Sequence, residues 1–181
     1  MAWRLRKTVV MVGMMGAGKT AVGTQLARML GVPYTDSDEE IVRAANMSIA
    51  EIFDRDGEAF FRHKESQVLA RLLAGRSCVL SAGGGAFLSE INRANITRAG
   101  VSVWLRADLD LLWNRVRHKT TRPLLRTADP RGTLAALLES RAPVYALADL
   151  TVDSVPGLSV EAMAMRVHEA LQSRPDVLER K

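Results

Sequence analysis

The fold is decided by one stretch near the start of the chain, Gly13-Met14-Met15-Gly16-Ala17-Gly18-Lys19-Thr20. It has the form G-x-x-x-x-G-K-[ST] and follows an apolar, strand-like run at residues 8–12. The glycines allow backbone conformations in which successive N–H groups surround phosphate oxygens at the start of a helix. In such loops the lysine, here Lys19, reaches the β- and γ-phosphates, and the hydroxyl of Thr20 ligates Mg²⁺. The stretch therefore predicts a P-loop that binds a nucleotide.

Outward from this loop, short apolar runs alternate with longer helical patterns, which is typical of βαβ units in a parallel sheet. Strands are predicted at residues 8–12, 33–35, 78–81, 101–105 and 150–152. Helices are predicted at residues 19–30, 58–73, 109–116, 133–141 and 160–171, with a further helix opening at the capping box that begins at Ser48. The 181 residues are one domain's worth of chain, so the sequence predicts a single α/β domain.

Several classes of protein are excluded by composition. The single cysteine, Cys78, excludes a disulfide framework and a cysteine-rich zinc site. No apolar run reaches the roughly 18 residues that a membrane span needs. Basic residues before the apolar run at 8–15 resemble a short signal peptide, but cleavage after that run would destroy the P-loop. We therefore expect a cytoplasmic protein with no membrane partner.

The charge balance leaves two kinds of partner open. The chain has 20 arginines and 5 lysines against 20 acidic residues, a net charge of +5. A basic balance of this size suits either nucleic acid or a small polyanionic ligand. Arginine suits phosphate and carboxylate groups better than lysine does, because its planar guanidinium binds them in a bidentate manner. A compositional bias would, however, produce the same excess of arginine.

The sequence Asp36-Ser37-Asp38 follows the second predicted strand. Alternate residues at a strand end point to the same side, so both carboxylates can face the crevice in which open α/β sheets bind ligands. There they could hold Mg²⁺ through water, accept hydrogen bonds from substrate hydroxyls or take a proton. The alternative is that Asp38 is the N-cap of a helix. Ser81 stands where many P-loop proteins place a metal-binding aspartate at a strand end, so the metal-side carboxylate must come from elsewhere.

Further candidate residues follow along the chain. Gly83, Gly84 and Gly85 follow a predicted buried strand, which suggests close approach of the backbone to a ligand or, alternatively, a plain turn. Arg62 and Glu65 are three residues apart in a helical stretch, and a surface ion pair is the default expectation. For Arg141, near a predicted helix end, the default role is to compensate the helix dipole.

Two further segments and the histidines have less specific expectations. Residues 118–132 form a polar, basic, proline-containing connection, which is either a lid or an ordinary exposed loop. The tail at residues 174–181 is expected to be disordered. The histidines His63, His118 and His168 lack metal-ligand spacing and are expected at the surface.

In their order and approximate spacing these motifs resemble the shikimate kinase family, together with Phe61-Arg62, Arg122-Pro123-Leu124-Leu125 and the stretch from Arg141 through Tyr145 to Asp149. The resemblance covers about residues 8–170. It implies the three-layer fold of nucleoside monophosphate kinases, a five-stranded parallel sheet flanked by helices, with a mobile lid at about 118–132. The implied activity is transfer of the γ-phosphate of ATP to the 3-hydroxyl of shikimate, in the aromatic amino-acid pathway.

The resemblance also implies a role for individual residues. It implies ATP binding by Gly16, Ala17, Gly18, Lys19, Thr20, Ala21, Arg115 and Arg122. Arg115 matches the arginine that lies against adenine in the family, and residues 152–156 are similar to its adenine loop, although these two matches are looser. It implies shikimate binding by Asp38, Phe53, Phe61, Arg62, Gly83, Gly84, Gly85 and Arg141. Mg²⁺ would be held by Thr20 and, through water, by Asp36. The implied catalytic residues are Lys19, Asp38 as candidate base, and Arg122 on the lid.

The implied partners are the small molecules ATP and shikimate, for a monomer that binds neither nucleic acid nor membrane. One rival is another small P-loop kinase, such as a gluconate kinase, but the triple glycine and the Asp-x-Asp with downstream Phe-Arg favour shikimate. The other rival is a basic nucleic-acid-binding module in which the P-loop serves regulation. The sequence offers no basic ribbon interleaved with aromatic residues to support it.

Overall fold

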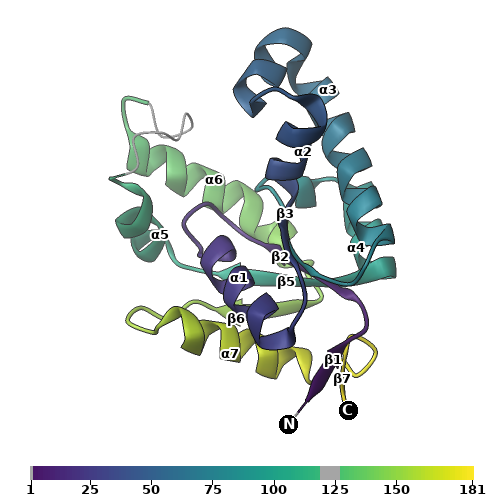
Figure 1. The fold of residues 1–181 in the computed structure, drawn as a ribbon. Helices are drawn as coiled ribbons and strands as arrows, with labels where there is room; N and C mark the ends of the chain where they lie inside the picture. The colour runs from purple at the N-terminus through teal and green to yellow at the C-terminus, as the bar shows by residue number, and fades with distance from the viewer. Residues whose placement is uncertain (1, 119–126) are drawn as a thin grey trace.

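The computed structural model describes residues 2–118 and 127–181. Its centre is a five-stranded parallel sheet in the spatial order β3-β4-β2-β5-β6 (Figure 1). The strands are β2 (Thr8–Val12), β3 (Tyr34–Asp36), β4 (Val79–Ser81), β5 (Gly100–Arg106) and β6 (Leu150–Asp153). A separate two-stranded sheet pairs β1 (Trp3–Leu5) with β7 (Leu178–Arg180).

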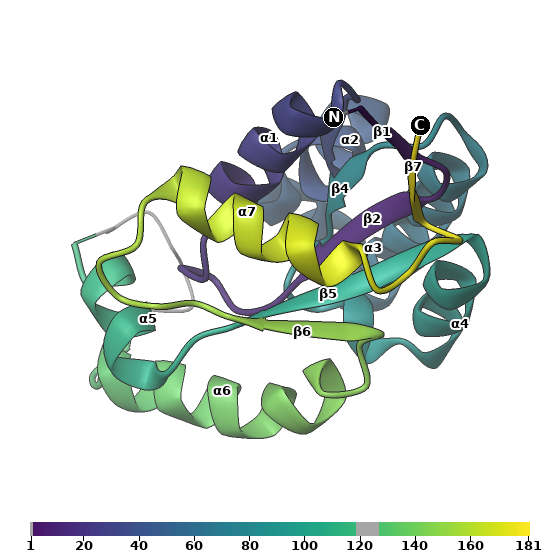
Figure 2. The same cartoon turned by 90° about the horizontal axis from the view of Figure 1, so that it is seen from below.

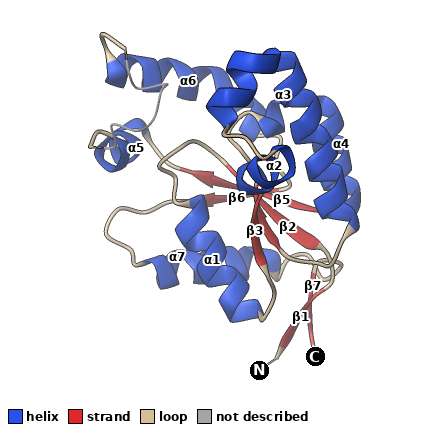
Figure 3. Ribbon diagram, turned by 45° about the horizontal axis from the view of Figure 1, so that its top comes forward, coloured by secondary structure: helices blue, strands red, loops and turns tan. Residues whose placement is uncertain are grey.

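Helices cover both faces of the main sheet. They are α1 (Lys19–Leu30), α2 (Ser37–Ala45), α3 (Ile49–Ala74), α4 (Glu90–Ala99), α5 (Leu109–Val116), α6 (Pro130–Tyr145) and α7 (Val160–Leu171), with a 3₁₀ turn η1 at Ala86–Leu88. Helices α1 and α7 lie side by side on one face, whereas α4 and α6 lie on the other (Figures 2 and 3). This arrangement confirms the predicted three-layer α/β fold.

The strand order places the candidate site. The central strand β2 lies between β4 and β5, so the loop that leaves its carboxyl end opens at a point where the chain turns to opposite sides of the sheet. Ser81 is paired with Met11 on one neighbour and with Asp36 on the other. The P-loop, Ser81 and Asp36 therefore start from the same edge of the sheet.

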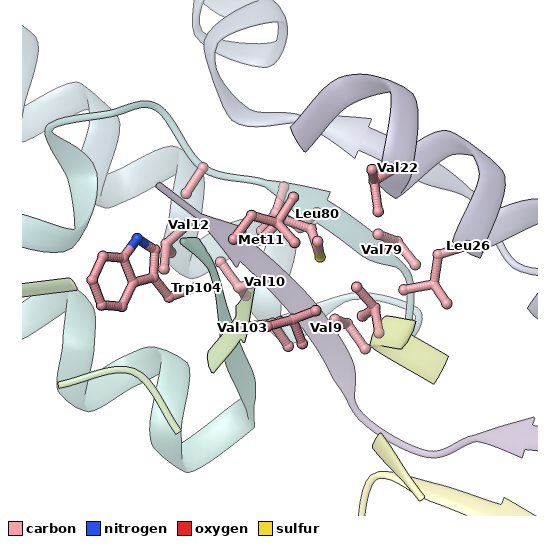
Figure 4. Packing of buried hydrophobic residues seen from close by; sticks show 14 of the residues in the cluster. Val9, Val10, Met11, Val12, Val22, Leu26, Val79, Leu80, Val103 and Trp104 are labelled. Carbon is pink, nitrogen blue, oxygen red and sulfur yellow. The ribbon is translucent and has the colours of Figure 1, made fainter. Parts of the chain in front are cut away.

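Two hydrophobic clusters support the molecule. The larger surrounds β2, whose residues Val9 to Val12 are at most 1% exposed, and includes Leu26, Leu80 and Val103 (Figure 4). The smaller cluster consists of Ile41, Ile52, Phe61 and Val68, from α2 and α3. The P-loop strand is therefore anchored in the main core, whereas α2 and α3 share a small core of their own.

The predicted disorder of residues 174–181 is wrong. Strand β7 pairs antiparallel with β1, and Val177 and Leu178 are buried. Ion pairs of Arg6 with Glu179 and of Lys7 with Asp176 reinforce this pairing. The two ends of the chain consequently lie next to each other (Figure 1). The polar composition of the tail concealed these contacts because its partner strand is at the opposite end of the sequence.

The expected surface position of His168 is also wrong. His168 is buried in α7, with its ring edge-on to Trp3 at a centroid distance of 5.2 Å. Its Nδ1 lies 2.9 Å from the side-chain amide of Gln172. Trp3 belongs to β1, which the sequence did not predict, so the partner that covers this histidine was not foreseen.

Other boundaries differ by small amounts. Strand β3 covers Tyr34–Asp36 where 33–35 was predicted, and α6 extends from Pro130 to Tyr145 where 133–141 was predicted. Helix α4 was not predicted; it begins after Ser89, whose hydroxyl accepts a hydrogen bond from the backbone N–H of Asn92. Of the lid predicted at 118–132, residues 119–126 lie outside the described residues, and residues 130–132 form the first turn of α6.

Candidate active site

The P-loop closes on itself between β2 and α1. Gly16 and Gly18 have φ angles of 83° and 94°, in the region that favours glycine. The ammonium group of Lys19 donates a hydrogen bond of 2.6 Å to the carbonyl of Gly13. From α5, the guanidinium of Arg115 donates to the carbonyl of Gly16 at 3.0 Å. These two contacts fix the loop at the N-terminus of α1, where the backbone N–H groups and the helix dipole favour an anion.

A single cleft of about 820 Å³ contains this loop. It is lined by every described residue that the family resemblance implicated: Gly16, Ala17, Gly18, Lys19, Thr20, Ala21, Asp36, Asp38, Phe53, Phe61, Arg62, Gly83, Gly84, Gly85, Arg115 and Arg141. Arg122 lies outside the described residues. The cleft thus brings together residues from the P-loop, α2, α3, α5, α6 and the segment after β4.

The two aspartates have different local roles. Asp36 is the N-cap of α2, and its Oδ1 accepts hydrogen bonds from the backbone N–H groups of Asp38, at 2.8 Å, and Glu39, at 3.2 Å. The cap expected at Asp38 is therefore two residues earlier. Asp38 lies in the first turn, and burial raises the pKa of its carboxyl, with a further rise from Asp36. Lys19 and Arg62 lower that pKa. Asp38 is thus a partly desolvated carboxylate that binds a proton more readily than an exposed aspartate.

Each glycine of the triple-glycine segment lies against one charged side chain. A Cβ atom on Gly83 would stand 2.6 Å from Oδ1 of Asp38, and one on Gly84 would stand 2.9 Å from Nη1 of Arg141. A Cβ on Gly85 would collide with the guanidinium of Arg62. The segment therefore passes close to three charged side chains, and a side chain at any of the three glycines would displace one of them. Close approach of this backbone to a ligand stays a prediction.

Tyr145 fixes this segment from α6. Its side chain is fully buried, and its hydroxyl donates a hydrogen bond of 2.6 Å to the carbonyl of Gly84. Arg141 precedes it by one helical turn and also faces Gly84. Arg141 therefore belongs to the cleft, beyond any role in compensating the helix dipole.

The pair of Arg62 and Glu65 extends from the cleft into the interior. Nη1 of Arg62 donates to Oε1 of Glu65 at 2.9 Å, and the Glu65 side chain is only 2% exposed. The expectation of a surface ion pair is therefore wrong for the glutamate. Burial raises the pKa of Glu65, and Arg62 opposes the rise. A half-exposed guanidinium tied to a buried carboxylate has a restricted orientation, which suits recognition of a planar anion.

Several cleft residues escaped the sequence analysis. Leu158, Val160 and Met163 line the cleft from the segment after β6 and the start of α7. Leu158 and Val160 are partly exposed apolar side chains. Ser154, which also lines the cleft, lies inside the expected adenine loop at 152–156, but nothing in the local pattern marked the residues beyond it. Their position depends on how α7 packs against α1.

The oxygen donors suit magnesium. Thr20, Asp36 and Ser81 all line the cleft. Burial raises the pKa of the neighbouring Tyr34, and the hydroxyls of Thr20 and Ser81 oppose this rise. Among the described residues no three histidine, cysteine or acidic side chains cluster as a metal site. Mg²⁺ needs no such cluster, because it is usually held by one or two protein oxygens, waters and substrate phosphates.

Across the two described ranges, no helix has both the length and the apolar character needed to cross a membrane.

Known proteins resemble the chain in sequence and in structure. The family model for shikimate kinase matches residues 15–172. A shikimate kinase from Cereibacter sphaeroides is 73% identical over 176 residues, which cover 97% of this chain and 88% of the relative. The solved structure of a shikimate kinase from Acinetobacter baumannii in complex with shikimate has a TM-score of 0.86 at 36% identity, over 92% of this chain and 93% of that one.

The rival kinase is represented by a gluconokinase from Sinorhizobium meliloti, with a TM-score of 0.63 at 19% identity, over 94% of each chain. This likeness concerns the fold alone. Because the shikimate kinase model spans the P-loop, α3, the triple glycine and α6, and the Cereibacter relative is 73% identical over almost the whole chain, the chain belongs to the shikimate kinase family.

Proposed function

We propose that the chain transfers the γ-phosphoryl group of ATP to the 3-hydroxyl of shikimate, giving shikimate 3-phosphate and ADP in the pathway to chorismate and the aromatic amino acids. Membership of the family supports the reaction. The observation that carries the proposal is the arrangement at the triple glycine, where Asp38, Arg141 and Arg62 each lie against one glycine in a cleft that also contains Lys19.

The acceptor end suits an apolar ring that bears hydroxyls and one carboxylate. Arg62 and Arg141 provide two guanidinium forks for the carboxylate, since arginine binds carboxylates in a bidentate manner. The rings of Phe53 and Phe61, with centroids 4.8 Å apart, offer an apolar wall. The carboxylate of Asp38 accepts hydrogen bonds from the ring hydroxyls.

The donor end suits ATP. The N–H groups of Gly16 to Thr20 and the ammonium of Lys19 bind the phosphates, Ala21 follows in the first turn of α1, and Arg115 borders the nucleotide side of the loop. From the family resemblance we assign Arg122 to the transferring phosphoryl group. Thr20 and, through water, Asp36 would hold Mg²⁺, which would supply neutralisation of the charge that develops on the phosphates.

Phosphoryl transfer depends mainly on positioning and on charge stabilisation. The 3-hydroxyl oxygen bonds to the γ-phosphorus as the bond to the ADP oxygen breaks. Asp38 orients that hydroxyl and accepts its proton, and the raised pKa of its carboxyl strengthens it as a proton acceptor. Lys19 stabilises the negative charge on the phosphate oxygens.

The active unit is proposed to be a cytoplasmic monomer of one domain. The described residues assigned to both substrates line one cleft within a single chain, which supports this proposal. Its ligands are proposed to be small molecules. The arginines assigned to the site favour a small polyanionic ligand over nucleic acid; they are Arg62, Arg115, Arg122 and Arg141. The remaining arginines have no assigned task.

A coupled assay of ADP release tests the proposal. Shikimate, gluconate and nucleoside monophosphates are offered in turn, with ATP and Mg²⁺, and turnover is expected with shikimate. Turnover with gluconate alone would overturn the assignment. Nuclease-sensitive, steeply salt-dependent binding of the purified protein to DNA or RNA would instead favour the nucleic-acid reading.

A further inference from the structure

Helix α3 is interrupted at one residue. Gly57 has φ 85° and ψ 171°, a non-helical conformation inside the span Ile49–Ala74. This region of backbone space is essentially accessible to glycine alone. A Cβ atom built on Gly57 would meet no atom within 4 Å, so the requirement for glycine concerns the backbone and not the available space. The bend that results is visible at the top of Figure 1.

The interruption lies between two parts of α3 that line the acceptor end of the cleft, and these two parts are the walls of the acceptor pocket. Before it, Ile49 and Phe53 line the cleft; after it, Phe61, Arg62 and Glu65 do so. The rings of Phe53 and Phe61 meet at a centroid distance of 4.8 Å and an interplanar angle of 37°. In a continuous helix, residues eight apart lie about 12 Å from each other along the axis, which would separate these rings. The ring contact therefore depends on the turn at Gly57.

Apart from the ring contact, the two walls share a small hydrophobic cluster. The small cluster of Ile41, Ile52, Phe61 and Val68 is separate from the main core. The residues on either side of the turn, from Asp54 to Asp56 and from Glu58 to Phe60, are exposed. Strain placed at Gly57 would consequently be relieved by local movement of the first part of α3, without disruption of the central sheet.

We propose that Gly57 is a positioning residue for the acceptor: its glycine-only conformation sets the spacing of Phe53 and Phe61 and the approach of Arg62 to the pocket. The inference rests on the proposed function, in which these residues bind shikimate. A residue with a Cβ atom favours relaxed conformations in which the walls are displaced. The apparent affinity for shikimate is then reduced in proportion to the fraction of molecules that keep the competent conformation. The P-loop is unaffected.

The test compares two glycines that both have a positive φ and open space around a built Cβ. Gly31 has φ 65° and ψ 34°, in the left-handed helical region, and it caps the far end of α1. Gly57→Ala is expected to raise the KM for shikimate about tenfold, given strain of a few RT in this backbone region. Its KM for ATP and its kcat at saturating shikimate should stay within about twofold of the wild type. Gly31→Ala should lower Tm and leave both KM values unchanged.

A second variant keeps the test decisive. Asparagine tolerates the left-handed helical region, as Asn46 does at φ 52° and ψ 36°, but this tolerance does not extend to the ψ of 171° at Gly57. Gly57→Asn is therefore expected to raise the shikimate KM about as much as Gly57→Ala does. An unchanged shikimate KM in either Gly57 variant, or an equal rise for ATP, would overturn the inference; failure of both variants to fold would overturn it too, because the inference requires that the strain be relieved locally. Wild-type enzyme that fails to phosphorylate shikimate would overturn the proposed function instead.

Discussion

The two ends of the cleft are held in different ways. The P-loop leaves β2, whose residues Val9 to Val12 are buried between neighbouring strands in the main core. The acceptor wall belongs to α2 and α3, which rest on the small separate cluster. In the proposed function, backbone N–H groups bind the phosphates, so their position follows from the sheet. Side chains bind the acceptor, so their position follows from a few contacts. Nucleotide binding should therefore resist changes that alter the acceptor pocket.

The largest effect is expected from Lys19→Ala, at the phosphate end. Loss of the ammonium group removes charge stabilisation from the transferring phosphoryl group, and kcat should fall by about 10³-fold. The folded structure should remain, since the lysine lies at the cleft surface and the β2 core is untouched. Steady-state kinetics and a thermal melt measure the two effects, with Lys64→Ala, a partly exposed lysine outside the cleft lining, as the control. Normal turnover would show that the loop does not serve catalysis.

Asp38→Asn should come next, with a loss of about 10²-fold in kcat, because the amide cannot accept the proton. The same change should raise stability. The pKa of Asp38 is higher in the folded protein than in the unfolded chain, so ionisation destabilises the fold as pH rises from the unfolded pKa through the folded one. Above that window the asparagine variant lacks this penalty.

Thermal melts from acid to neutral pH would measure the stability change, with kcat followed over the same range. We expect the Tm difference between variant and wild type to vanish at low pH, where Asp38 is protonated. The wild-type kcat should fall on the acid side as Asp38 takes up its proton. A variant less stable than the wild type at neutral pH would contradict the burial of this carboxylate.

Arg62→Lys sharpens the contrast between the two ends. A point charge replaces a bidentate fork, so shikimate binding should weaken by about 10-fold to 100-fold, while the KM for ATP stays close to that of the wild type. The matched control is Arg55→Lys, an exposed arginine of the same helix. Equal losses for both substrates would argue against binding of the acceptor carboxylate by Arg62.

The smallest effect is expected from Tyr145→Phe, which removes one hydroxyl from the buried contact with Gly84. The loss of this hydrogen bond should lower the free energy of unfolding by about 1–2 kcal/mol. Because the triple-glycine segment is then less constrained beside Arg141, the shikimate KM should rise a few fold, and the ATP KM should not. Urea denaturation and steady-state kinetics provide both values. No change in either would mean that Tyr145 merely fills space.

Local signals in the sequence were read correctly where they are strong. Helix α1 was predicted at residues 19–30 and ends as expected, because Gly31 adopts the left-handed conformation that closes a helix. Strand β2 was predicted at its observed bounds, because an apolar run followed by a glycine-rich loop has few other readings. The cleft residues were recognised from motif spacing, and the described ones share one cleft; their individual roles stay proposals.

Pairings between distant segments were read poorly. The tail was expected to be disordered, yet Arg6 and Glu179 pair across 173 positions, and His168 is covered by Trp3. Glu65 was assigned to the surface because its spacing from Arg62 fits any exposed helix. Whether such a residue faces water depends on what packs above it, and no local pattern contains that information.

The sequence by itself determined the α/β class and the nucleotide loop, since glycines and periodicity act over short distances, and its resemblance to the shikimate kinase family indicated the candidate site residues. Only the tertiary structure decided which glycine lies under which charged group, that Glu65 is buried behind Arg62, and that Gly57 folds α3 back so that Phe53 meets Phe61. Those features depend on contacts between segments far apart in the chain, whose energies exist only once the chain has folded.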